Sequence, residues 1–250
     1  MSASSGYEKK VLLRRALVRI KYLSPLTVAL FCLILCALPV CRFDDGYDLR
    51  RAQSVINISS ESGKRSAATL AAKESTDVDV ALAGRLRPLP AVTAVIFAVS
   101  LIGAAVLAGA SVYAFSLPPD SDRCNLFKVR FRFFFPGRWL HFLLLILPAI
   151  PTAIPYYVAS SFTEYYRVRG VTETATGAQM PEYYTYSVRF AGVNPLIAAG
   201  VAVVLSVVLF IAVSGWERAY RLDLFSEFEK EKNSDSAKKR RTSGQSGADS

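Results

Sequence analysis

The sequence contains one histidine, His141, and no spacing of histidine and cysteine that would bind zinc. It also contains no P-loop and no glycine-rich phosphate-binding motif. With one histidine, multi-histidine metal sites are excluded, and a histidine-based triad would have to use His141, which no serine or cysteine motif accompanies. We therefore expect no catalytic residues, no cofactor and no metal ion, and we interpret His141 as a polar residue at a membrane edge.

Cysteine is scarce and poorly placed for a disulfide framework. Cys32, Cys36 and Cys41 lie in or at the end of the first apolar run, and Cys124 lies between the second and third runs. Because none of them falls well inside a segment expected to lie outside the cell or in a lumen, we expect no disulfide scaffold. Cys124, beside basic and aromatic residues, is a candidate for S-palmitoylation, and the alternative is a thiol without a role.

Charge is missing from four stretches of about 18 residues or more, although charged residues make up 20% of the chain. A helix of that length crosses a hydrocarbon core about 30 Å thick, at a rise of about 1.5 Å per residue. The sequence therefore predicts an all-α, multi-pass integral membrane protein: a four-transmembrane-helix bundle with two outer loops and cytosolic termini. The predicted transmembrane helices are residues 23–41, 89–117, 139–160 and 194–215.

The segments between the apolar runs differ in composition. We expect residues 1–22 to form a basic amphipathic segment, 118–138 a basic and aromatic loop against the inner leaflet, and 216–250 a disordered tail, all in the cytosol. The alternative for 1–22 is the positive flank of a signal anchor, which predicts the same side of the membrane. The outer loops are 42–88 and 161–193. We expect the first to be loosely folded, with a helix or hairpin as the alternative, and the tyrosine-rich second to lie across the membrane face or to meet a partner.

The first apolar run begins after Ser24 and Pro25, a pair that is typical of a helix N-cap and first turn. The alternative to a first span is a cleaved signal peptide. The basic flank before the run is long for a signal peptide, and residues 37–41 offer no small-x-small cleavage site. We therefore expect an uncleaved first span.

The distribution of lysine and arginine predicts the orientation. The segments expected in the cytosol contain 19 of these residues, against 11 in the two outer loops. Arg42, Arg85 and Arg87 oppose this assignment, because they flank the first two spans on the outer side. Asn57 supports it, because Asn57-Ile58-Ser59 is an N-glycosylation sequon in the first outer loop. Asn57 is therefore a candidate glycosylation site, and the choice between plasma membrane and endomembrane stays open.

Small residues recur in the second span at steps of four. They form two rows, and the candidates for helix packing are Ser100, Ala104 and Ala108 in one row and Ala105 and Gly109 in the other. Small side chains allow two helix backbones to approach closely in lipid. We expect this part of the span to pack against another helix.

The third span contains three prolines, Pro148, Pro151 and Pro155. Proline removes a backbone donor and bends a helix unless neighbouring groups satisfy the freed carbonyls. A kinked helix is expected. The kink is either a passive feature of the bundle or a hinge in a channel or transporter.

The net charge of +10 arises from residues in the gaps between the apolar runs. This placement favours contact with anionic lipid headgroups and disfavours nucleic acid as a partner. Arg240-Arg241-Thr242-Ser243 matches a pattern that basophilic kinases favour, so Ser243 is a candidate phosphorylation site; the alternative is an unmodified tail.

These observations favour a non-enzymatic membrane organiser, scaffold or accessory subunit that acts on other membrane proteins or on copies of itself. The alternative is a channel or transporter subunit that uses the proline-kinked third span. The central parts of the spans contain no Asp, Glu, Lys or Arg, which argues against an ion-coupled transporter or pump.

Overall fold

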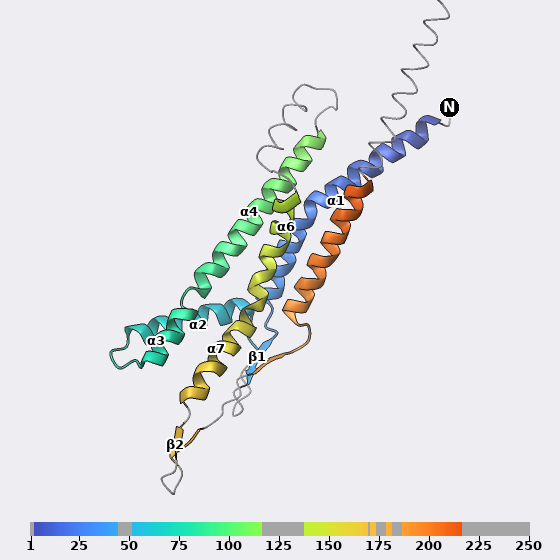
Figure 1. The fold of residues 1–250 in the computed structure, drawn as a ribbon. Coiled ribbons are helices and arrows are strands. Elements are labelled where there is room, and N and C mark those ends of the chain that lie inside the picture. Colours follow the sequence, from blue (N-terminus) through green and yellow to red (C-terminus); the bar gives the residue numbers. More distant parts are fainter. Residues whose placement is uncertain are drawn as a thin grey trace, which may run out of the picture. The chain divides into compact units, whose positions relative to one another are not determined.

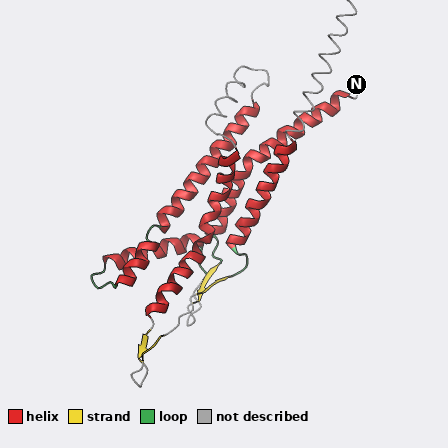
Figure 2. Cartoon of the chain, in the orientation of Figure 1, coloured by secondary structure: helices red, strands yellow, loops and turns green. Residues whose placement is uncertain are grey.

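The computed structural model describes residues 3–44, 52–116, 138–169, 171–173, 179–181 and 187–216. These residues are mostly helical, as the colours of Figure 2 show. Four helices among them are long and apolar enough to cross a membrane: Arg19–Ala37, Asp77–Tyr113, Trp139–Tyr165 and Pro195–Trp216. The prediction of four long apolar helices is thus confirmed.

The chain divides into two units, Tyr22–Val207 and the terminal segments Met1–Lys21 with Val208–Ser250. Along the chain, the elements in Figure 1 are α1 (Ala3–Ala37), β1 (Cys41–Asp44), α2 (Val55–Ala71), α3 (Asp77–Leu86), α4 (Leu89–Ser116), α6 (Arg138–Ile146), η1 (Leu147–Ala153), α7 (Ile154–Arg169), β2 (Val171–Glu173), β3 (Gln179–Pro181), β4 (Ser187–Phe190) and the Pro195–Trp216 helix. In the terminal unit, Lys21 Nζ lies 4.7 Å from the centroid of the Phe210 ring, a cation–π contact.

α1 is one continuous helix through Ser24 and Pro25, so the predicted helix start at Ser24 is wrong. The helix also ends at Ala37 rather than at Cys41. Pro25 removes one backbone donor inside the helix, but it is fully buried, and its packing keeps the helix intact. Thr27 Oγ1 donates to the Ser24 carbonyl oxygen at 2.9 Å within the same turn.

The segment 42–88 is largely helical, so the prediction of a loosely folded loop is wrong and its alternative, a helix, is right. α2 and α3 each begin at a side-chain cap. Ser54 Oγ accepts from the Asn57 N–H at 3.1 Å, and Thr76 Oγ1 accepts from the Asp79 N–H at 3.4 Å. The buried side chains of α2 recur at helical spacing and are mostly small: Val55, Ile58, Ser59, Ser62, Gly63 and Ser66.

α2 crosses the beginning of α4 at close range because these side chains are small. A Cβ atom at Gly63 would lie 2.7 Å from Cδ of Pro90, and nearer still to its Cγ. Beside this crossing, the buried hydroxyls of Ser59 and Thr93 are 3.1 Å apart. Thr93 Oγ1 donates to the Leu89 carbonyl oxygen at 2.7 Å, so Ser59 is the donor to Thr93.

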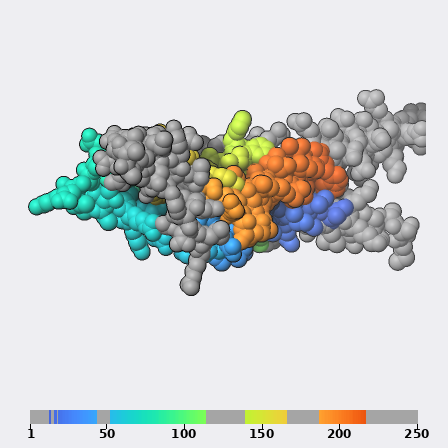
Figure 3. All heavy atoms as spheres, turned by 90° about the horizontal axis from the view of Figure 1, so that it is seen from below, coloured from blue at the N-terminus to red at the C-terminus, as the bar shows by residue number. Residues whose placement is uncertain are grey.

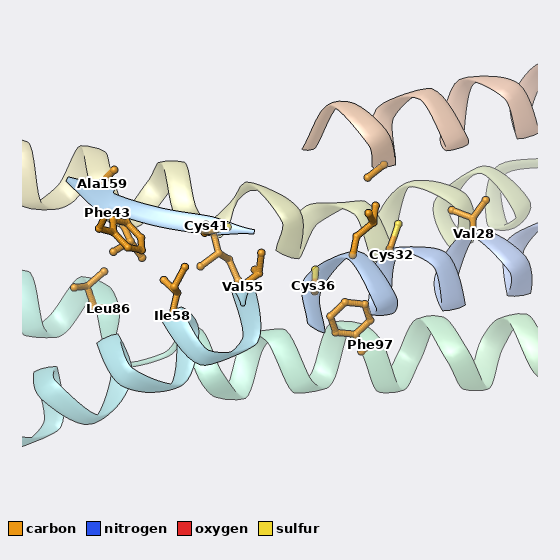
Figure 4. Packing of buried hydrophobic residues seen from close by; sticks show 14 of the residues in the cluster. Val28, Cys32, Cys36, Cys41, Phe43, Val55, Ile58, Leu86, Phe97 and Ala159 are labelled. Atoms are coloured by element: carbon orange, nitrogen blue, oxygen red, sulfur yellow. The ribbon is translucent and has the colours of Figure 1, made fainter. Parts of the chain in front are cut away.

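One buried apolar cluster connects the long helices of the Tyr22–Val207 unit with α2 and α3. Figure 4 shows Cys32 and Cys36 of α1 near Phe97 of α4, and Val55 and Ile58 of α2 beside β1. Leu145 of α6 belongs to the same cluster and is fully buried. α2 and α3 are therefore docked onto the bundle and share its core.

The third apolar helix changes its geometry at the prolines. Residues 147–153 form the 3₁₀ segment η1 between α6 and α7, and Pro148 and Pro151 lie buried inside it. Pro155 is the second residue of α7. Thr152 Oγ1 donates to the Ala149 carbonyl oxygen at 2.6 Å, which satisfies one acceptor in this irregular segment. The prolines thus coincide with an interruption of the α-helix.

β1 and β4 pair as antiparallel strands beside the ends of two apolar helices. Phe43 of β1 is buried in the core cluster, whereas Arg42 next to it is exposed. This alternation is the ordinary pattern of a sheet with one buried face. The Pro195–Trp216 helix follows β4, and few of its residues are buried; part of it lies on the surface seen in Figure 3.

Candidate functional site

A cleft of about 200 Å³ opens between α2, α3 and α7. Its lining residues come from all three helices: Ser62, Arg65, Ser66 and Thr69 of α2, Val78, Asp79, Leu82, Ala83 and Leu86 of α3, and Phe162 and Tyr165 of α7. The second half of α7 thus continues past the apolar part of its helix and forms one wall of the cleft.

The cleft combines apolar and polar groups. Leu82, Leu86 and Phe162 supply apolar surface, and Arg65 and Asp79 supply charges of opposite sign. Thr76 Oγ1 donates to Asp79 Oδ2 at 2.8 Å, which holds this carboxylate at the start of α3. Such a lining suits a group with an apolar body and a polar end.

An ion pair links α3 to α7 near the cleft. Arg85 Nη1 donates to Glu164 Oε2 at 2.8 Å, and Arg85 Cζ lies 5.3 Å from the centroid of the Tyr165 ring. Both charged side chains are substantially exposed, so their contribution to stability is modest. The contact instead orients Tyr165, which lines the cleft, relative to α3.

The structure separates the two rows of small residues in α4. The residues Ser100, Ala104 and Ala108 are buried, whereas Ala105 and Gly109 are exposed. Among the described residues, the first row is therefore the one that packs inside the chain. The hydroxyl of Ser100 donates to the Ile96 carbonyl oxygen at 2.6 Å, so this buried polar group is satisfied inside its own helix.

Sequence reasoning missed two glycines where helices approach most closely. Gly63 lies against Pro90, and a Cβ atom at Gly103 would be 2.8 Å from Cδ2 of Leu144 in α6. A glycine inside a helical segment is the signal that points to such approaches, because glycine otherwise weakens a helix. The register that places Arg42 opposite Arg189 was also missed, since the two residues are far apart in the sequence.

Asn57 lies exposed on the first turn of α2. The hydroxyl of Ser59, which completes the sequon, is almost fully buried and bonded to Thr93. The asparagine is accessible in the folded chain, but the complete sequon is not. Sequons that are used lie typically on surface loops.

The remaining candidate residues have different surroundings. His141 is buried and lies edge-on to the rings of Tyr22 and Phe142, two residues after the start of the Trp139–Tyr165 helix, and its place at a membrane edge stays a prediction. Burial raises the pKa of the Cys41 thiol to about 11, which disfavours a reactive thiolate there. Cys124 and Ser243 lie outside the described residues, and their modification stays a prediction.

Comparison with protein-family models finds no matching family, and comparisons with curated proteins and with solved structures find no similar chain. Functional inference therefore depends on this chain's own residues.

Proposed function

We propose that this chain is a non-enzymatic, four-span integral membrane protein that acts as an organiser, scaffold or accessory subunit through protein–protein contacts. The observation that carries the proposal is the cleft between α7 and the two consecutive helices α2 and α3, which we call the α2–α3 hairpin. Its volume of about 200 Å³ is below the range of about 300–1,000 Å³ that is typical of small-molecule sites. It fits one or two side chains of a protein partner better than a whole substrate.

Exposed apolar surface supports the membrane setting. The Pro195–Trp216 helix exposes a series of large apolar side chains: Ile197, Val201, Val204, Leu205, Val208 and Ile211. A continuous apolar patch of this kind requires a partner, and lipid chains match its chemistry. The lysine and arginine distribution supports cytosolic termini, so α2 and α3 lie on the outer side, and the basic segments contact anionic lipids.

A charge reversal at the cleft should dissociate the proposed complex. In Arg65→Glu, a negative charge replaces the positive charge that lines the cleft, and we expect the partner's affinity to fall by at least about tenfold. Lys64→Glu is the matched control, because Lys64 is the exposed neighbour on α2 and does not line the cleft. The measurement is native electrophoresis of the full chain after extraction from its own membranes in digitonin.

The wild type and Lys64→Glu should migrate as one discrete species larger than the chain in its micelle, and Arg65→Glu should migrate as the smaller species. A wild-type chain that is monomeric in every mild detergent contradicts the proposal. Equal behaviour of the two variants assigns the contact to a surface other than the cleft.

We further propose that Asn57 is glycosylated, and that this happens before α2 docks onto α4. The burial of the Ser59 hydroxyl supports this order, because a glycosylating enzyme would meet a hidden sequon in the folded chain. We expect endoglycosidase to increase the mobility of the wild type but not of Asn57→Gln. A tag after Ser250 should be shielded from protease in intact cells. Bare Asn57 together with an exposed tag contradicts the orientation.

The alternative function, a channel or transporter subunit, is favoured by one observation. The 3₁₀ segment η1, with its buried Pro148 and Pro151, interrupts the third long helix, and 3₁₀ stretches inside helices often mark hinges. Reconstituted vesicles discriminate between the two functions. Solute flux that changes in Pro151→Ala supports the alternative, and absence of flux removes it.

A further inference from the structure

Two arginines face each other on the exposed side of the β1–β4 sheet. Arg42 of β1 is the register partner of Arg189 of β4, and both side chains are exposed. Directly opposite residues in an antiparallel pair have Cβ atoms about 4.5–5.5 Å apart, and like charges at such positions destabilise the sheet. An anion between the two guanidinium groups removes this repulsion.

The sheet lies beside the ends of two long apolar helices. β1 begins just after α1 ends at Ala37, and the pairing continues toward the last helix, since the Ala191 N–H donates to the Val40 carbonyl oxygen at 2.8 Å. Asn194 then caps the Pro195–Trp216 helix: its Oδ1 accepts from the Leu196 N–H at 3.0 Å. The arginines are therefore only a few residues from both apolar segments.

Aromatic residues lie beside the sheet. Tyr156 of α7 accepts a hydrogen bond from Asn194 Nδ2 at 2.5 Å, and its ring lies 5.4 Å from the ring of Phe190, the neighbour of Arg189. Tyr156 and Tyr157 are both exposed. They lie in the second half of the Trp139–Tyr165 helix, and exposed tyrosines are typical of the membrane–water interface, where lipid phosphates lie.

We propose that Arg42 and Arg189 together bind the phosphate of an anionic phospholipid in the leaflet on the side of the α2–α3 hairpin. The inference rests on the proposed membrane setting. Guanidinium groups bind phosphate through two parallel hydrogen bonds, and each has five N–H donors. Arg189 already makes an interaction within the chain, and the proposed site requires that its guanidinium group also donates to the phosphate.

The proposal explains two arginines that are otherwise unexpected on the outer side of the bundle. Arg85, another basic residue on this side, is paired with Glu164 inside the chain. Arg42 instead faces a second cation, so a ligand with negative charge is the partner of complementary chemistry. A lipid fits the arginine pair better than a soluble anion does, because its acyl chains contact the two apolar helices beside the sheet.

The test compares two double variants that each remove two positive charges. Arg42→Gln with Arg189→Gln removes the proposed site. Lys64→Gln with Arg87→Gln removes two exposed positive charges of the α2–α3 region, neither of which lines the cleft, and is the control. The full chain in dodecyl maltoside is titrated with dioctanoyl phosphatidylglycerol, dioctanoyl phosphatidylcholine or inorganic phosphate, and its melting temperature is followed.

We expect phosphatidylglycerol to raise the melting temperature of the wild type and of the control variant. Removal of both sheet arginines should raise the phosphatidylglycerol concentration needed for a given shift by roughly 30-fold. Each arginine near an anionic lipid surface contributes a factor of about five in affinity, and the two factors multiply. Each variant's shift is measured from its own melting temperature without lipid, because Arg189→Gln also removes the interaction that Arg189 makes within the chain. A sheet variant that melts cooperatively without lipid but shows no shift has lost the lipid site and not its fold.

Three results overturn the proposal. Equal loss in both double variants indicates a diffuse charge effect, and an equal response to phosphatidylcholine indicates no selectivity for anionic lipid. A shift with inorganic phosphate equal to that with phosphatidylglycerol indicates a soluble anion. Alkaline carbonate extraction of native membranes separates the two proposals: release of the wild type contradicts the membrane setting as well, whereas a retained chain without lipid response contradicts the lipid site alone.

Discussion

Replacing Leu145 by alanine should lower the free energy of unfolding by about 2–5 kcal/mol. Leu145 is fully buried in the cluster that joins α6 to the other long helices, so the truncated side chain leaves a cavity that its neighbours fill only in part. The apparent melting temperature in detergent should fall by roughly 5–15 °C. Size-exclusion chromatography of heated samples measures the fraction that stays monodisperse.

Leu143→Ala is the matched control on the same helix. Leu143 is 51% exposed, and lipid or detergent chains occupy the space that its side chain leaves. This variant should stay within about 0.5 kcal/mol of the wild type. Equal losses in the two variants would show that the packing around α6 differs from the one described.

Gly63→Ala should destabilise the chain by about 1–3 kcal/mol, although alanine is the better helix former. The added methyl group would overlap with the ring of Pro90, which cannot rotate away as the end of a long side chain can. This steric cost exceeds the gain of up to about 1 kcal/mol in helix propensity. Because Ser62 and Arg65 line the cleft on either side of Gly63, displacement of α2 should also weaken the partner complex.

Gly84→Ala makes the same substitution where nothing opposes it. A Cβ atom at Gly84, in α3, would have no neighbour within 4 Å. The propensity term alone then acts, and the variant should gain about 0.5–1 kcal/mol. Thermal unfolding of the two variants side by side measures the difference, and a stable Gly63→Ala would place α2 farther from α4.

The long helices could be predicted because a charge-free apolar run is a strong signal that needs no knowledge of its neighbours. α4 begins at Leu89, the predicted start of the second span, and the last helix occupies Pro195–Trp216 against the predicted 194–215. The error at Ser24 has a physical reason: a serine–proline pair starts many helices, but tertiary packing around a buried proline carries α1 straight through it.

The cleft and the sheet could not be predicted from local patterns. α2 buries Ser59, Ser62 and Ser66, so its inner face lacks the apolar stripe by which an amphipathic helix is recognised. The caps at Ser54 and Thr76 were visible in the sequence and were the available signal. The meeting of α7 with α3, and of β1 with β4, depends on contacts between distant segments, which composition does not encode.

The antiparallel pair of β1 and β4 also constrains the order in which the chain can be completed. The ribosome makes β1 directly after the first long helix, but its partner strand emerges only after α4, α6 and α7 have been synthesised. Until then, β1 has an open edge that can pair with other extended chains. Closing so long a loop is also slow, since its entropy is lost before the strand contacts form. A nascent chain arrested before Ser187 would therefore expose the unpaired backbone N–H and C=O groups of β1. Quality-control factors that bind such an edge can distinguish unfinished from finished molecules at this strand.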